Sequence, residues 1–281
     1  MDRREALRII AAEAGRGELN FPTSVEVALG VQRALDDPDC HLEAAARLVR
    51  SEPLLSARVV ALANSVAFNR SGRPITDVRI AVSRLGFRMI RALAAAVVAR
   101  QMAGVSSDPA HRLLAERLWQ HTAHVAALAH VLARKVTRLD PETAMFAGIV
   151  HEVGGFYLLS RLRDFPCLFG GRAGVAIEDG EEPAGEAEIG RAVLRVLSVP
   201  GVVVAAIEAL WAGAPALPPA SLGDTLLLAD WLSPVKSPLQ AAADRAAAPE
   251  AIDLVIGREA LAGILEDSAE EVDSMIVALC C

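Results

Sequence analysis

Apolar residues recur every three to four positions along most of the chain, with polar residues between them. One such stretch runs through Val25, Ala28, Val31 and Leu35 and stops at an Asp-Asp-Pro sequence. This spacing places the apolar side chains on one face of a helix. No segment alternates apolar and polar residues in the manner of a half-buried strand. The pattern therefore predicts an all-α fold.

Helix start and stop signals divide this pattern into elements. Pro53 follows Ser51-Glu52 and opens one helix, and Asp140-Pro141-Glu142 opens another with a capping carboxylate before the proline. Thr76 is the expected N-cap of a helix over 77–85, and Gly86 separates that helix from the next. Further helices are expected at 42–50, 87–102 and 111–136, with other starts at Ser237 and Asp267 and a flexible loop at 170–183.

A polar connection over 104–108 indicates a boundary between two halves. We expect two packed helical subdomains, residues 1–105 and 106–281. No apolar run reaches the roughly 20 residues needed to cross a bilayer, and the acidic start lacks the apolar core of a signal peptide. The four cysteines have no metal-ligand spacing and are expected to be free thiols. These features predict a soluble, cytoplasmic protein.

Charge is distributed unevenly along the chain. The formal net charge is −7, yet residues 41–100 hold ten arginines against three acidic residues. The overall sign argues against general nucleic-acid binding. The arginine-rich segment permits two interpretations: the first half binds an anionic ligand, or its arginines pair with acidic residues of the second half of the same chain.

Short motifs in the first half occur in a recognisable order. They are Phe21-Pro22, Asp37-Pro38, Ser51-Glu52-Pro53-Leu54, Leu62-Ala63-Asn64-Ser65, Ile75-Thr76-Asp77 and Ala81 through Gly86. In this order and spacing they resemble the N-terminal half of the HDOD (HD-related output domain) family. The resemblance marks Pro53, Asn64, Ser65 and Gly86 as family-motif residues, whereas Glu52 stands where the family usually has aspartate. Structural roles also explain two of these residues, because Asn64 can bond helix-end carbonyls and Gly86 can form a sharp joint.

The second half is similar to the HD superfamily of metal-dependent phosphohydrolases, which implies an HD-like helical bundle. In active members a histidine, an adjacent His-Asp pair and a distant aspartate hold a divalent ion. The matching positions here are His121, His151, Glu152 and Asp230. Imidazole and carboxylate together suit such an ion, which generates hydroxide from bound water near neutral pH.

Several differences from active members argue against catalysis. Glu152 replaces the aspartate and carries its carboxylate one methylene further out, and Gly155 stands where active relatives often have lysine. The extra histidines and the Gly-Tyr-Pro element of HD-GYP phosphodiesterases are also missing. We therefore expect no catalytic residue, no cofactor and no bound metal, with His121 and His151 joining two helices through hydrogen bonds.

Three functions follow from these observations. The first is a non-catalytic bacterial signal-transduction module that binds other signalling proteins, as the HDOD resemblance implies. The second is a divergent metal-dependent phosphohydrolase that uses the four HD-like residues. The third is nucleotide or RNA binding by the arginine-rich first half.

Overall fold

A computed structural model describes most of the chain. The described residues are 1–21, 25–35, 37, 39–104, 108–169, 184–213, 216, 218–239 and 258–280. Throughout these ranges the regular elements are helices, and none of the described residues forms a strand. The predicted all-α fold is confirmed. None of the described helices is both long and apolar enough to cross a membrane.

The helices follow one another with short connections, as the start and stop signals predict. Those up to the expected boundary are α1 (Arg3–Gly15), α2 (Glu26–Leu35), α3 (Leu42–Ser51), α4 (Pro53–Ala63) and α5 (Val78–Ala103). Those beyond it are α6 (Pro109–Leu132), α7 (Pro141–Val150), α8 (Val153–Ser160), α9 (Ala184–Val196), α10 (Gly201–Ala212), α11 (Leu222–Leu232), α13 (Arg258–Glu266) and α14 (Ala269–Cys280).

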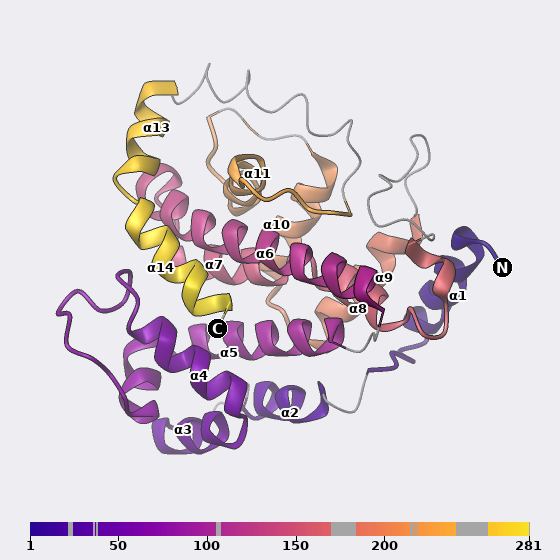
Figure 1. Cartoon of the computed structure of the whole chain (residues 1–281), viewed down its shortest axis with the longest axis horizontal. Helices are drawn as coiled ribbons and strands as arrows, with labels where there is room; N and C mark the ends of the chain where they lie inside the picture. The colour runs from indigo at the N-terminus through magenta and orange to yellow at the C-terminus, as the bar shows by residue number, and fades with distance from the viewer. Residues whose placement is uncertain are drawn as a thin grey trace.

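Helix α5 is the central element between the two halves. It packs against α2, α3 and α4 on one side and against α7 and α8 on the other (Figure 1). Its segment from Ala92 to Ala99 is almost completely buried. The small side chains of this segment let helices approach closely from both sides. Because α5 contacts helices of both halves, it does not mark a border between them. The division into two subdomains therefore stays a prediction.

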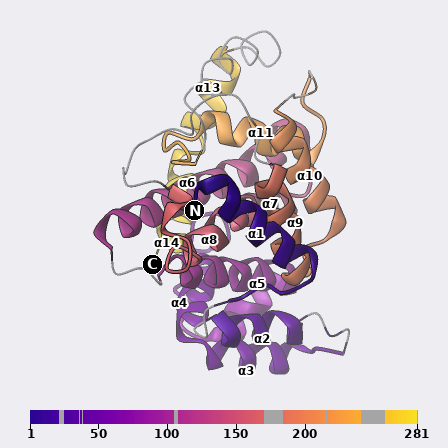
Figure 2. The same ribbon diagram turned by 90° about the vertical axis from the view of Figure 1, so that its right-hand side faces the viewer.

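The first and last helices make packing contacts across the expected boundary between the two halves. Helix α1, which the sequence analysis did not mark as a helix, packs against α9 of the second half (Figure 2). Helix α14 packs against both α6 and α4, and the hydroxyl of Ser274 accepts a hydrogen bond from the backbone N–H of Val66. The first and last helices therefore each pack on an element distant in sequence.

Most of the predicted helix ends are confirmed. The carboxylates of Glu52 and Asp140 accept backbone hydrogen bonds at the starts of α4 and α7. The expected cap Thr76 is wrong, because the carboxylate of Asp77 accepts from the backbone N–H of Ile80 and α5 begins one residue later. An aspartate adjacent to a threonine is an equally good cap, and here its register fits the first turn.

Two backbone features modify the expected helices. Gly86 has φ 74° and ψ 163° within α5, so this glycine joins two helical segments as expected. The helix expected over 111–136 ends at Leu132, and a π-helical turn over Ala133–Thr137 (η2) follows it. Several expectations fall outside the described residues. They are the loop at 170–183, the prolines of the Phe21-Pro22 and Asp37-Pro38 motifs, and the continuation of the Ser237 start beyond residue 239.

Candidate functional site

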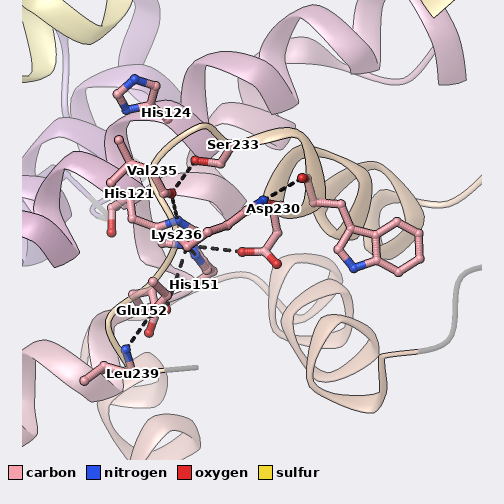
Figure 3. A network of polar contacts seen from close by, with 12 residues as sticks. His121, His124, His151, Glu152, Asp230, Ser233, Val235, Lys236 and Leu239 are labelled. Atoms are coloured by element: carbon pink, nitrogen blue, oxygen red, sulfur yellow. Dashed lines mark hydrogen bonds and ion pairs between the residues drawn. The ribbon is translucent and has the colours of Figure 1, made fainter. Parts of the chain in front are cut away.

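Three helices bring the candidate metal ligands together. His121 lies in the middle of α6, His151 directly follows α7, and Asp230 lies in the last turn of α11 (Figure 3). The packing of α7 and α11 on α6 directs all three side chains to one point. The relative exposures of the three residues are 0%, 5% and 5%, so the site is buried.

The distances between their donor atoms are short. The two Nε2 atoms of His121 and His151 lie 3.2 Å apart, and His121 Nε2 lies 3.1 Å from Asp230 Oδ1. One atom from each of these residues falls within a group no wider than 4.8 Å. Glu152 Oε1 lies 3.9 Å from His121 Nε2, but this residue is not part of the group. The structure thus gathers three of the four predicted residues and leaves the fourth beside them.

Backbone carbonyls fix the proton positions of both imidazoles. His121 Nδ1 lies 2.8 Å from the Val235 carbonyl oxygen, and His151 Nδ1 lies 2.7 Å from the Gly148 carbonyl oxygen. Because a carbonyl oxygen only accepts hydrogen bonds, each Nδ1 must carry a hydrogen and donate it. Both Nε2 atoms therefore face the centre of the site as potential donors of a lone pair.

The pKa values of the two histidines shift in opposite directions. Burial lowers the pKa of His151, and the nearby His121 lowers it further against the opposing carboxylates. Burial also opposes protonation of His121, but the hydrogen bond to Asp230 and the charge of Glu152 outweigh it and raise the pKa. Of the two imidazoles, His121 therefore takes up a proton more readily than His151.

The three donors fit a divalent ion in kind, and the two separations measured at His121 fit it in spacing. Ligand bonds of about 2.0–2.1 Å place neighbouring donor atoms roughly 2.8–3.0 Å apart in octahedral geometry and roughly 3.3–3.4 Å apart in tetrahedral geometry, so the full range is about 2.8–3.4 Å. The separations of 3.1 and 3.2 Å at His121 lie in that range. An ion held by His121, His151 and Asp230 would lower the pKa of a bound water and so supply hydroxide.

A segment after α11 covers this site. Besides the carbonyl of Val235, it contributes Lys236, whose Nζ donates to the backbone carbonyl of Trp231 at the end of α11 (Figure 3). Leu239 lies so close to Gly155 that a Cβ on that glycine would come within 2.4 Å of the leucine Cδ1. Sequence reasoning missed this segment, because Val235 acts through its carbonyl and leaves no side-chain signal.

The remaining predicted residues lie elsewhere. His130 is buried on another face of α6, with its Nδ1 3.8 Å from Glu271 Oε1 on α14. Asn64 ends α4, where its amide donates to the carbonyls of Val60 and Ile75 at 2.9 and 2.7 Å. The hydroxyl of Ser65 donates to the carbonyl of Leu62. These contacts give the Asn64-Ser65 motif a structural role.

Comparisons with known proteins agree with this architecture. The chain is similar to a candidate metal-dependent phosphohydrolase from Shewanella amazonensis, with 21% identity, 99% coverage of both chains and a TM-score of 0.67. An HDOD domain protein of unknown function from Geobacter sulfurreducens has 24% identity, 98% coverage of both chains and a TM-score of 0.60. A candidate signal transduction protein from Marinobacter aquaeolei has 19% identity and a TM-score of 0.61, with coverage of 100% of this chain and 67% of its own.

No curated protein matches the sequence significantly. The HDOD domain family matches residues 21–210, which is more than half of the chain and includes both the Asn64-Ser65 motif and the two clustered histidines. The chain therefore belongs to the HDOD domain family.

Proposed function

We propose that this chain is a non-catalytic signalling module that acts by binding other proteins. The observation that carries this proposal is the burial of the histidine–aspartate cluster, whose three members are at most 5% exposed. Hydrolysis of a phosphate ester requires the reacting phosphorus to reach a water on the ion. The packed side chains around this cluster favour a structural centre over a catalytic one.

The surroundings of Gly155 support the same conclusion. Active relatives often carry a lysine at this position, where a positive charge attracts the phosphate group. Here Leu239 fills the space that any side chain at 155 would need. The charge of that lysine is therefore missing at position 155, and a side chain there would require Leu239 to shift.

The cluster retains a clear role in such a module. His121 is linked to the segment after α11 through Val235, to α7 through His151, and to α11 through Asp230. These contacts fix three elements relative to one another, with an ion or a proton at the centre. Membership of the HDOD family supports a signalling role, and the Marinobacter relative described as a signal transduction protein has the same fold.

A turnover assay tests the absence of catalysis. The purified protein is incubated anaerobically with Fe²⁺, Mn²⁺ or Zn²⁺, and release of nitrophenolate from bis(4-nitrophenyl) phosphate is compared with that of His151→Ala. Cleavage of cyclic dinucleotides is followed in parallel. We expect equal, background rates in both proteins. A rate that the wild-type chain shows and His151→Ala lacks would refute the proposal.

A binding experiment tests the other part of the proposal. The tagged chain is recovered from its native cells, and each recovered protein is competed with an excess of untagged chain. We expect at least one signalling protein that is recovered in constant proportion and displaced by the competitor. Recovery of no displaceable partner under any growth condition would count against a binding module.

A divergent metal-dependent phosphohydrolase is the second candidate, and the convergence of two Nε2 atoms and a carboxylate favours it. Elemental analysis separates the two candidates when it is combined with the turnover assay. A divalent ion lost in His151→Ala, together with turnover, would establish the enzyme. A bound ion without turnover would agree with a structural centre, and the expectation of no bound metal would then be wrong.

A further inference from the structure

A groove of about 570 Å³ lies between the end of α4 and the start of α5, far in sequence from the histidine cluster. It is called the α4–α5 groove below. Its lining combines two arginines with two hydroxyl groups and apolar side chains, and includes Arg73, Arg84, Ser71, Thr76, Ile75 and Ile80. Its volume lies within the roughly 300–1,000 Å³ that small-molecule sites occupy.

Side-chain amides hold the loop that forms this groove. Asn64 Oδ1 accepts a hydrogen bond from the backbone N–H of Ile75 at 2.7 Å, and Asn69 Nδ2 donates to the carbonyl of Arg73 at 2.8 Å. The hydroxyl of Ser71 donates to Asn69 Oδ1. Asn69 is only 9% exposed, and all three bonds are partly buried. The groove is therefore formed before any ligand binds, and the Asn64 motif shapes it.

One arginine of the groove is fixed in place by its own hydrogen bonds. Arg84 Nη1 donates to Asn69 Oδ1 at 2.8 Å and to the carbonyl of Phe68 at 3.3 Å. Within the described part of the chain its Nε and Nη2 make no hydrogen bond. A guanidinium anchored through one nitrogen loses little side-chain entropy when the others bind a ligand. Arg73 also lines the groove and is exposed on the loop that precedes α5.

The charges around the groove favour an anion. Asp77 is the acid in its lining, and this carboxylate already accepts a hydrogen bond from the N–H of Ile80. Neighbouring arginines on α5 are neutralised elsewhere, because Arg79 pairs with Glu43 and Arg88 pairs with Asp140. Arg73 and Arg84 are thus the cations available to a ligand in the groove.

We propose that the α4–α5 groove binds the phosphate group of a small phosphorylated molecule of nucleotide size. Two guanidinium groups match a phosphate monoester, which carries a charge of about −1.5 to −2 at neutral pH, better than a singly charged carboxylate. Thr76 adds a hydroxyl donor, and the exposed side chain of Ile80 provides an apolar surface for the rest of the molecule. This site is independent of the histidine cluster and of the function proposed for it.

Isothermal titration calorimetry with AMP, GMP, inorganic phosphate and guanosine tests the proposal on the full chain. We expect AMP or GMP to bind more tightly than phosphate, guanosine not to bind, and the affinity to fall as NaCl is raised. Arg73→Gln and Arg84→Gln should each weaken binding by about tenfold or more, since each removes charge-assisted hydrogen bonds. Arg79→Gln is the matched control on the same helix and should leave the affinity unchanged.

Several outcomes would overturn the inference. Absence of saturable binding of AMP, GMP and phosphate up to millimolar concentration would refute the site. Equal losses in Arg79→Gln and Arg84→Gln would show a general charge effect instead of a site. Phosphate that binds as tightly as the nucleotides would refute the nucleotide-sized ligand, and a phosphoserine peptide that binds more tightly than either would point to a protein partner. Arg73→Gln, on the exposed loop, keeps the test valid if Arg84→Gln disturbs the fold.

Discussion

The closest helix contact near the histidine cluster gives a sharp test of the packing. Gly148 on α7 faces Ala126 on α6, and a Cβ at position 148 would lie 2.5 Å from the Cα of Ala126 and 2.8 Å from its backbone nitrogen. Neither atom can move as a flexible side chain would. Gly148→Ala therefore forces the two helices apart at the point that aligns His121 with His151.

The size of the effect follows from this geometry. To bring a 2.5 Å approach to an ordinary contact of 3.4 Å, the backbones must separate by about 0.9 Å. Overpacking of a core typically costs about 1–3 kcal/mol, and a contact with backbone belongs at the upper end, so we expect a loss of about 3 kcal/mol. For a chain of this size that loss lowers Tm by roughly 6–10 °C.

Thermal denaturation followed by circular dichroism measures this loss. Gly30→Ala on α2 is the matched control, because a Cβ there meets nothing within 4 Å. The control should stabilise the protein by about 0.5–1 kcal/mol through the higher helix propensity of alanine. If Gly148→Ala melts within about 1 °C of the wild-type protein, the close approach of α6 and α7 is wrong.

Two further predictions concern residues outside the cluster. Asn64→Ala removes both donations to backbone carbonyls and the acceptor for Ile75, which should cost about 2 kcal/mol in urea denaturation. Asn64→Asp keeps the acceptor but places a second oxygen against the two carbonyls, so it should destabilise the protein at least as much, and equal stability of all three proteins would contradict the role of the amide. Burial lowers the pKa of His130 to about 4, although Glu271 opposes the shift. The unfolded state therefore takes up this proton first, and stability should fall by up to about 3 kcal/mol as pH drops from 6.5 towards 4. His130→Gln should flatten this part of the pH profile, and an unchanged slope in the variant would refute the assignment.

Local signals in the sequence were sufficient for many of the helices. Caps such as Glu52 and Asp140 act within one turn, so their effect can be recognised from neighbouring residues alone. The same reasoning failed at Thr76, because two adjacent capping residues compete and only the register of the first turn decides between them. It also missed α1, although Asp2 is a good cap and Leu7, Ile10 and Ala14 form an apolar face.

Which elements meet could not be read from periodicity. An apolar face predicts that a helix packs on something, but the sequence does not say that α1 packs on α9 or that α14 packs on both α4 and α6. The convergence of His121, His151 and Asp230 came from the family resemblance, since these residues span more than 100 positions. The carbonyls of Val235 and Gly148 that orient the imidazoles belong to the backbone and leave no trace in residue identity.

Replacement of a metal ligand and loss of access of a phosphate ester to the cluster are two separate changes, and the structure distinguishes between them. The replacement at Glu152 leaves three donor atoms within 4.8 Å of one another, in a group of residue types that suits a divalent ion. The second difference lies at Gly155, where the charge of the lysine is missing and where any side chain would require Leu239 to shift. The burial of the cluster and the missing lysine at position 155 support the proposed binding module, and the turnover assay distinguishes that module from a weakened enzyme.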